Sequence, residues 1–259
     1  MTVEINGEVA YREAARFPDH TQALRLLQKY SRLDADAATV GLRHANPSLY
    51  RAVDAHADAH HVVRAVAAAS PATPLNGIQE QRLSIRYFDE HPVTVDVLAA
   101  ITTAAAAFDQ EAWTEQAAGT DLQVLVAARD VAGLPPAIYA HRPHTETFVR
   151  VGDLPTGDES ADLVLQVEFA DSPAIVLICG PLAASLDRHG EHGHRLLLSR
   201  AGAAAYAGWL TAIDHGLVGS IFAGFLATSL RPLAPVDGYY TTQLLALAVG
   251  HPRQRHRTP

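Results

Sequence analysis

The spacing of apolar residues changes near residue 70 of this chain. Before that point, apolar side chains recur at helical spacing in residues 21–33 and again in residues 47–69, and both stretches are predicted to be helices. Prolines in residues 70–74 then break the pattern, because proline lacks a backbone donor and restricts the residue before it. The pattern therefore predicts a helical N-terminal appendage, residues 1–75, followed by a main domain, residues 76–259.

Within the main domain, short apolar runs alternate with longer helical stretches. The runs at residues 122–127, 147–151, 174–179 and 244–249 have the length and composition of strands. Residues 196–215 have the length and spacing of a buried helix. This mixture favours an α+β fold, in which a sheet is flanked by helices.

Composition and charge narrow the class of protein. At 259 residues, with 48% hydrophobic and 19% charged residues, the chain is long enough to bury a full core. Its net charge of −8 and its pI of about 5.9 argue against a nucleic-acid partner, since phosphate backbones require clustered Lys and Arg. The single cysteine, Cys179, excludes an internal disulfide and a cysteine-based metal cage.

The first residues show no targeting segment, because they are neither basic nor followed by an apolar stretch. No apolar run in the chain reaches the ~20 residues needed to span a bilayer. A cytoplasmic protein without a membrane partner is therefore expected.

Two arginines and a serine alternate in the stretch Arg82-Leu83-Ser84-Ile85-Arg86, just before a polar turn. In an extended segment alternate residues share one face, which would bring two guanidiniums and a hydroxyl together. The rigid fork of arginine donors fits a phosphate in bidentate fashion, so this stretch is a candidate anion-binding site. The alternative is a solvent-exposed strand whose arginines only increase solubility.

Several motifs follow this stretch in order. They are Gly-Leu-Pro-Pro-Ala-Ile-Tyr at residues 133–139, the apolar run at 174–179, Gly-Leu-Val-Gly-Ser-Ile-Phe-Ala-Gly-Phe at 216–225 and a last apolar run that ends in Gly-His-Pro at 250–252. In this order the features resemble the FMN-dependent nitroreductase superfamily, from about residue 78 to the C-terminus. The Gly-Leu-Pro-Pro-x-Ile-Tyr element is similar to the SagB-type branch, dehydrogenases that oxidise azolines in modified peptides.

The resemblance implies a nitroreductase-like fold with a largely antiparallel sheet, and FMN as the cofactor. It assigns contacts with the phosphate, the ribityl chain and the pyrimidine edge of FMN to Arg82, Ser84 and Arg86.

Two later segments carry further FMN contacts by the same resemblance. The backbone amides of Ala223 and Gly224 approach the flavin in a turn of small residues, where glycine lets the backbone come close. After the last strand a basic residue contacts the phosphate, and Arg253 or Arg255 fills that position. The alternatives are a purely structural turn and a C-terminal tail without fixed contacts.

The chain departs from the SagB-type pattern ahead of its long helix. That branch has a Lys-Tyr pair with a part in proton abstraction, and the matching positions here are Arg188 and His189. Arginine stays charged, whereas imidazole takes up a proton near neutral pH. His189 is therefore the candidate general base, with an ordinary loop histidine as the alternative, and Arg188 is a candidate to stabilise negative charge.

Two other family elements are also altered. Residues 202–207 stand in place of Gly-His-x-x-Gln-Asn, and residues 116–119 stand in place of Pro-Ser-x-Gly, so polar groups expected beside the cofactor or substrate are missing. These departures are compatible with a divergent substrate, with a protein that works only beside a paired homologue, or with loss of the flavin.

Three histidines and a glutamate lie within residues 188–195, but their spacing matches no zinc pattern and the flanking arginines repel a cation. No metal site is expected.

The resemblance predicts an FMN-dependent oxidoreductase that carries out two-electron dehydrogenation of an azoline or similar ring in a modified peptide. It also implies a dimer, either a homodimer or a heterodimer with a paralogue, because the family builds each FMN site between two subunits. Two alternatives stand beside this prediction. One is an NAD(P)H-dependent reductase of nitro compounds or quinones, and the other is a non-catalytic partner subunit.

Overall fold

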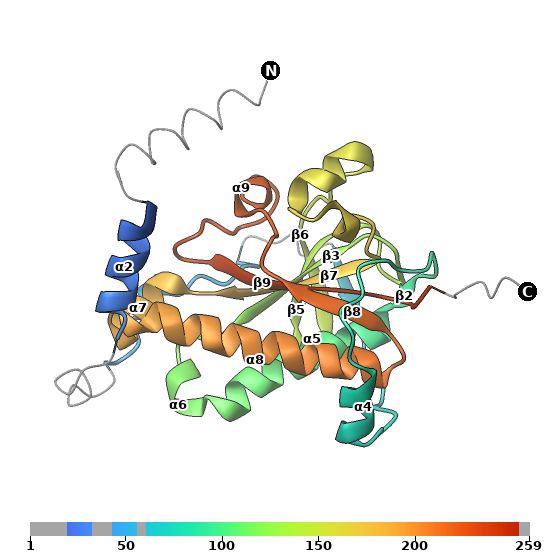
Figure 1. The fold of residues 1–259 in the computed structure, drawn as a ribbon, viewed down its shortest axis with the longest axis horizontal. Coiled ribbons are helices and arrows are strands. Elements are labelled where there is room, and N and C mark those ends of the chain that lie inside the picture. The colour runs from blue at the N-terminus through green and yellow to red at the C-terminus, as the bar shows by residue number, and fades with distance from the viewer. Residues whose placement is uncertain (1–19, 33–42, 56–60, 254–259) are drawn as a thin grey trace, which may run out of the picture.

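A seven-stranded sheet forms the centre of the computed structural model, which describes residues 20–32, 43–55 and 61–253 (Figure 1). The strand order is β1-β6-β5-β3-β7-β9-β8, and each neighbouring pair is antiparallel. β1 and β8 are therefore the two edge strands. The strands are β1 Val62–Arg64, β3 Gln123–Ala128, β5 Ala137–Arg142, β6 Thr147–Gly152, β7 Ala174–Gly180, β8 Val218–Phe222 and β9 Thr242–Gly250.

Two long helices, α5 (Val95–Ala112) and α8 (His192–Asp214), pack side by side on one face of the sheet (Figure 1). α8 confirms the buried helix predicted at residues 196–215 and begins one turn earlier. The other described elements are α2 His20–Tyr30, η1 Pro47–Leu49, α4 Leu75–Gln81, β2 Val93–Thr94, α6 Thr114–Ala117, β4 Val131–Ala132, η2 Pro143–Thr145, η3 Gly157–Leu163, η4 Val167–Phe169, α7 Leu182–His189 and α9 Ala227–Leu230. None of the described helices combines the length and the apolar character needed to cross a membrane.

The central strands are buried on both faces. On β7, Val176 belongs to the core beneath α5 and α8, whereas its neighbour Leu177 belongs to a second core on the opposite face. In that second core Phe169 and Phe222 stack with ring centroids 4.2 Å apart. A strand covered on both faces has no polar side, which is why residues 174–179 form an uninterrupted apolar run. The four predicted strands in the main domain are confirmed.

The predicted helix at residues 47–69 is wrong for the part that the structure describes. Only η1 is helical there, and β1 pairs with the edge of β6. The backbone N–H of Val53 donates to the side chain of Gln123 over 2.7 Å. Alanine, a strong helix former, is the commonest residue in this stretch, but strand pairing and this long-range hydrogen bond outweigh its propensity.

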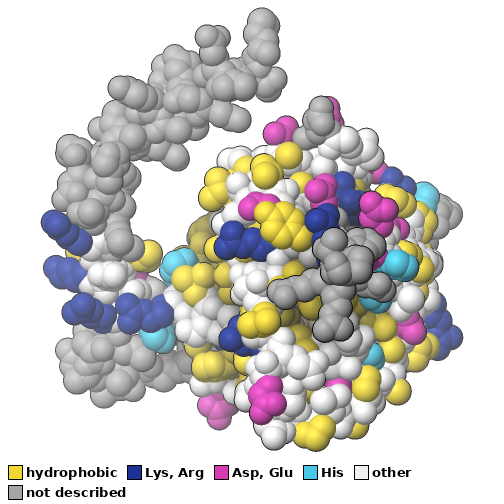
Figure 2. All heavy atoms as spheres, turned by 45° about the vertical axis from the view of Figure 1, so that its right-hand side comes forward, with side chains coloured by type: hydrophobic (Ala, Val, Ile, Leu, Met, Phe, Trp, Pro, Cys, Tyr) yellow, Lys and Arg dark blue, Asp and Glu magenta, His cyan; other side chains and the backbone are white. Residues whose placement is uncertain are grey.

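The other N-terminal helix is confirmed by α2. Its apolar residues Leu26, Leu27 and Tyr30 are exposed, and Figure 2 shows basic side chains gathered on this helix beside the main body. At its end, the carbonyl oxygen of Ser31 lies 3.2 Å from Nδ1 of His192, at the start of α8. The remainder of the predicted appendage before α2 lies outside the described residues.

Candidate functional site

Residues 82–88, here called the arginine segment, lie beside the edge strand β8. Ile85 N–H donates to the carbonyl oxygen of Gly219 over 3.0 Å, and Ser84 forms a parallel bridge with the same residue. Farther along, Phe88 forms a bridge with Pro252, just past the end of β9. The segment is thus held at two points, and it covers β8 only near Gly219.

The two arginines of this segment have no acidic partner. The guanidinium of Arg82 lies 5.0 Å from the ring centroid of Trp209 on α8, and Arg86 is exposed. Among the described residues no carboxylate pairs with either guanidinium. The nearby Asp89 instead accepts a hydrogen bond from His91, which holds the pKa of that carboxyl below its usual value. Two positive charges are therefore available to an anionic ligand.

Arg253 joins the same region. Its Nε donates to the carbonyl oxygen of Phe88 over 2.9 Å, and its guanidinium lies 5.7 Å from the ring centroid of Tyr87. The structure therefore brings Arg253 to the arginine segment, and its contact with the FMN phosphate stays a prediction. Arg255 lies outside the described residues.

Ala223 and Gly224 follow the far end of β8. Ala223 lies four positions after Gly219, which corresponds to about 13 Å of extended backbone. The carbonyl oxygen of Gly224 accepts a hydrogen bond from Leu165 N–H over 2.6 Å. A Cβ at residue 224 would lie 2.5 Å from the side-chain oxygen of Gln166, so only glycine fits this approach.

Gln166 is a polar residue that the sequence did not single out. Its Oε1 is buried beside Gly224 and has no hydrogen-bond partner within the described chain. A buried acceptor without a donor is costly, and a ligand that carries an N–H would satisfy it. No periodicity or motif marks Gln166, because it lies in the irregular segment between η3 and η4.

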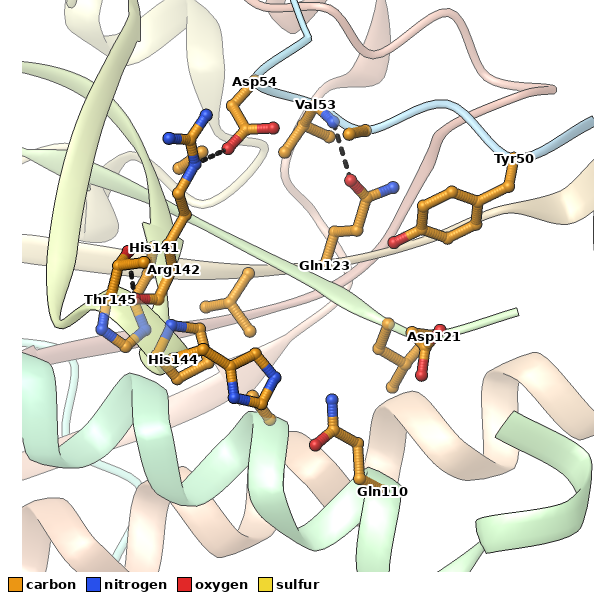
Figure 3. A pocket seen from close by; sticks show the side chains of 16 residues that line it. Tyr50, Val53, Asp54, Gln110, Asp121, Gln123, His141, Arg142, His144 and Thr145 are labelled. Atoms are coloured by element: carbon orange, nitrogen blue, oxygen red, sulfur yellow. Dashed lines mark hydrogen bonds and ion pairs between the residues drawn. The ribbon is translucent and has the colours of Figure 1, made fainter. Parts of the chain in front are cut away.

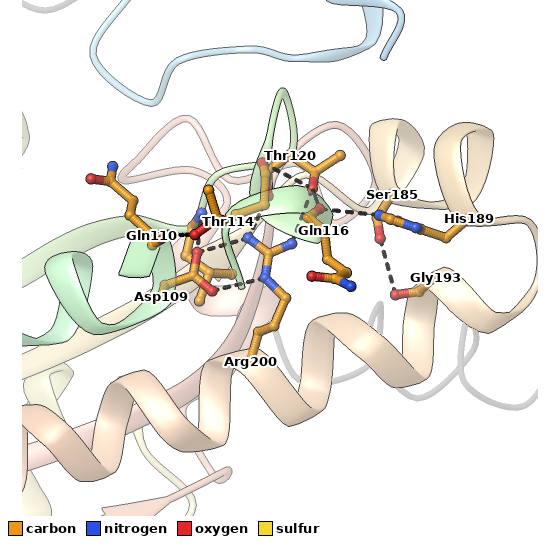
Figure 4. Close-up of polar contacts among 11 residues, drawn as sticks. Asp109, Gln110, Thr114, Gln116, Thr120, Ser185, His189, Gly193 and Arg200 are labelled. Carbon is orange, nitrogen blue, oxygen red and sulfur yellow. Dashed lines mark hydrogen bonds and ion pairs between the residues drawn. The ribbon is translucent and has the colours of Figure 1, made fainter. Parts of the chain in front are cut away.

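His189 and Arg188 end helix α7 and contact the loop around α6 (Figure 4). His189 Nε2 lies 3.1 Å from the carbonyl oxygen of Gln116. A carbonyl only accepts, so Nε2 carries the proton and Nδ1 holds the lone pair. Burial lowers the pKa of His189 below its usual value, which keeps the imidazole neutral near pH 7. Arg188 donates to the carbonyl oxygens of Arg43 (3.0 Å) and Glu115 (2.7 Å).

The structure does not bring His189 and the arginine segment together within one chain. His189 ends α7, just before α8 begins, whereas Arg82 lies over Trp209 near the other end of α8. The 17 residues from His192 to Trp209 span roughly 26 Å along the helix axis. The arginine segment and His189 therefore lie near opposite ends of α8.

A buried ion pair supports the loop beneath His189 (Figure 4). Arg200 on α8 donates to both carboxylate oxygens of Asp109 on α5 over 2.8 and 2.7 Å, and it also donates to the hydroxyl and carbonyl oxygens of Thr120. The side chains of Arg200 and Asp109 are 0% and 1% exposed. The network fixes the positions of α5, α8 and Thr120 relative to one another, and Thr120 lies just after α6.

The histidine-rich stretch 188–195 forms a tight junction between α7 and α8. Gly190 turns the chain with a φ of 64°, a value that other residues rarely adopt. In the part of the chain that the structure describes, no three His, Cys, Asp or Glu side chains are arranged to hold a metal ion.

Comparisons with known proteins place the chain in a family. Residues 80–251 match the nitroreductase family. A Methanocaldococcus jannaschii protein named as a nitroreductase, MJ1384, is 30% identical over 185 residues, which cover 68% of this chain and 90% of that protein. The chain belongs to the nitroreductase family, a family of oxidoreductases.

Two solved structures share the fold at low sequence identity. A protein from Anabaena variabilis, described as a nitroreductase, superposes with a TM-score of 0.67 and 17% identity over 89% of this chain and 47% of its own. This chain thus spans about half the length of that relative. A Ralstonia eutropha protein of the same description gives a TM-score of 0.56 and 16% identity over 83% of this chain and 96% of its own. These likenesses confirm the predicted nitroreductase-like α+β fold.

Proposed function

We propose that this protein is an FMN-dependent oxidoreductase whose cofactor lies along the free edge of β8. The observation that carries the proposal is the unpaired guanidinium pair of Arg82 and Arg86 at one end of that edge. The chain as a whole carries a net charge of −8, so two neighbouring arginines without acidic partners, one half-buried and one exposed, mark a local site for an anion.

The donor and acceptor groups fit the two ends of FMN. Arg82, Arg86 and Arg253 supply charged donors for the phosphate. At the other end, Gly224 allows close approach of the backbone, and Gln166 offers an unsatisfied acceptor for a ring N–H. Ser84 lies exposed beside Gly219, where it is available to the ribityl hydroxyls.

Bound FMN would supply two-electron redox chemistry, while the protein positions the substrate and moves a proton. The proton acceptor we propose is Nδ1 of His189, since Nε2 is committed to the carbonyl oxygen of Gln116. Arg188 would act as a positioning residue, because its side chain donates to two backbone carbonyls.

The substrate class we propose is an azoline or similar ring in a modified peptide. Support comes from the Gly-Leu-Pro-Pro-Ala-Ile-Tyr element at residues 133–139, which resembles SagB-type dehydrogenases. In this chain the element has a structural role, since the buried Tyr139 donates its hydroxyl to the carbonyl oxygen of Pro135 over 2.8 Å. It therefore supports kinship with that branch and not contact with the substrate.

The alternative enzyme, an NAD(P)H-dependent reductase of nitro compounds or quinones, differs in its electron donor. Bleaching of the flavin by added NAD(P)H under anaerobic conditions would favour it. Bleaching by a thiazoline-containing peptide would favour the dehydrogenase. A non-catalytic partner subunit would respond to neither until a homologous subunit is added.

We propose a homodimer, in which the arginine segment and His189, near opposite ends of α8, are the two half-sites of each chain. A two-fold arrangement that packs α8 antiparallel to its copy would place the arginine segment of one chain near His189 of the other. The family resemblance supports the same arrangement, with each FMN site built between two subunits.

The dimer is expected to persist at micromolar concentration, because it would complete both sites and cover exposed apolar side chains such as Leu198 and Phe108. Multi-angle light scattering at decreasing concentration measures this. A monomer at micromolar concentration would contradict the homodimer. If that monomer associates with a paralogue, a heterodimer replaces the proposed homodimer.

An Arg86→Ala variant is expected to bind FMN about tenfold or more weakly, because it loses a charge-assisted contact worth roughly 1.5 to 3 kcal/mol. Titration of the apoprotein with FMN, followed by flavin fluorescence, gives the dissociation constant. The matched control is Arg64→Ala, which removes an equally exposed arginine on β1, at the opposite edge of the sheet. A wild-type protein that is colourless and takes up no added FMN would overturn the cofactor proposal.

A further inference from the structure

A hollow of about 510 Å³ opens at the end of β3 and β5 (Figure 3). Residues 50–54 form one wall, the C-terminal half of α5 forms another, and residues 140–145 close the third side. In Figure 3, Tyr50, Asp121 and Gln110 lie across the opening from the residues of β5 and η2. A volume of this size is typical of pockets that hold small molecules.

The hollow is separate from the arginine segment. Gly219, beside that segment, connects through the register of β9 and β7 to Ala128 at one end of β3. The hollow is lined by Gln123 at the other end of β3. Five residues along the strand and three strand spacings across the sheet correspond to about 17 Å and about 14 Å. The hollow and the arginine segment therefore lie well apart on the sheet.

One negative charge in the hollow lacks a partner. Asp54 is paired with Arg142, and Arg200 nearby is engaged by Asp109. No described side chain donates a hydrogen bond to the carboxylate of Asp121. Burial raises the pKa of Asp121 above its usual value, which shows that its charged form is poorly solvated here.

Besides the ion pair of Asp54 and Arg142, the hollow is lined by polar side chains that include Tyr50 and His141. Burial is the main reason that the pKa of Tyr50 is raised to about 12, so its hydroxyl keeps its proton. His141 is 7% exposed, and burial lowers its pKa to about 4. Its Nδ1 has no hydrogen-bond partner among the described residues. A ligand with a positively charged donor would satisfy the carboxylate of Asp121.

Apolar side chains form the remaining wall. Val53, Leu122 and Val124 line the hollow and belong to the two cores of the protein. A ligand here would thus place an apolar part against a rigid surface, and its cationic part at the carboxylate.

We propose that this hollow binds a small organic amine whose ammonium group pairs with Asp121 and whose apolar part lies against Val53, Leu122 and Val124. An ammonium supplies several donors, so it can pair with the carboxylate of Asp121 and also donate to the hydroxyl oxygen of Tyr50, which lies on the same side of the opening (Figure 3). Its positive charge restores the stabilisation that the half-buried carboxylate lost on leaving water. This site does not depend on flavin binding.

Phenethylamine is a suitable probe, because it joins an ammonium group to an apolar ring. Isothermal titration calorimetry with the full-length protein as purified is expected to show saturable binding at millimolar concentration or below. Phenylacetate, of similar size and opposite charge, is expected not to bind. The Asp121→Asn variant is expected to bind phenethylamine at least tenfold more weakly, because it keeps the side-chain shape and loses the charge.

The matched control is Asp162→Asn, which removes the same charge from an exposed position outside the hollow and should leave phenethylamine binding unchanged. Comparison of the two probes on the wild-type protein tests the proposal without any variant. No saturable binding of phenethylamine, equal binding of phenylacetate, or unchanged affinity in Asp121→Asn would each overturn it.

Discussion

An Asp109→Ala variant is expected to lose about 3 to 5 kcal/mol of its free energy of unfolding. The substitution leaves the guanidinium of Arg200 fully buried, without the carboxylate that receives two of its hydrogen bonds at 2.8 and 2.7 Å. It also removes the acceptor for the backbone N–H of Leu122. Since most domains are stable by only 5 to 15 kcal/mol, about a third of the total would be lost.

Urea unfolding followed by circular dichroism measures this loss as a lower transition midpoint. The control is Arg64→Ala, which breaks an ion pair between Arg64 and Glu146 in which both side chains are solvent-exposed. That variant is expected to lose no more than about 1 kcal/mol, because water screens exposed pairs. Equal losses in the two variants would show that the buried pair contributes no more than a surface pair.

A His189→Ala variant is expected to reduce substrate turnover by roughly 10² to 10⁴, the usual contribution of a positioned general base. In the wild-type protein, activity should rise with pH as the imidazole loses its proton. Because burial lowers the pKa of His189 below its usual value, this rise should fall on the acid side of pH 6.5, with a plateau above it. Rapid-mixing measurements with a thiazoline-containing peptide at a series of pH values give both results.

The matched control is His194→Ala, which removes a half-buried imidazole from the first turn of α8 while leaving His189 in place. Flavin content should remain at the wild-type level in both variants, because neither residue is proposed to hold the cofactor. Wild-type turnover with a flat pH profile in His189→Ala would make His189 an ordinary structural residue.

The sequence predicted the elements whose cause is local. β7 and β9 can be recognised in the sequence as long apolar runs, because both of their faces are covered. α8 can be recognised because helical spacing of apolar residues persists over many turns. The arginine segment was visible for the same reason, since its alternation is contained within a few residues. The family resemblance pointed to Arg253, whose side chain contacts the carbonyl oxygen of Phe88, and its role at the phosphate stays a prediction.

What the sequence could not show depends on distant contacts. Arg200 and Asp109 are 91 residues apart in the sequence. The sequence of α8 alone does not show that Arg200 is buried and paired with a carboxylate. The helix predicted at residues 47–69 is wrong because β1 forms by pairing with β6. The sequence of residues 47–69 gives no sign of that distant partner. Gln166 is marked only by its position in the structure, where its unpaired side-chain oxygen lies against Gly224.

The separation of the half-sites along α8 has a genetic consequence in the proposed homodimer. Each site would combine the arginine segment of one chain with His189 of the other. A chain defective at Arg86 and a chain defective at His189 would then form a mixed dimer with one doubly damaged site and one undamaged site. Two alleles that are each inactive alone would therefore complement each other when expressed together.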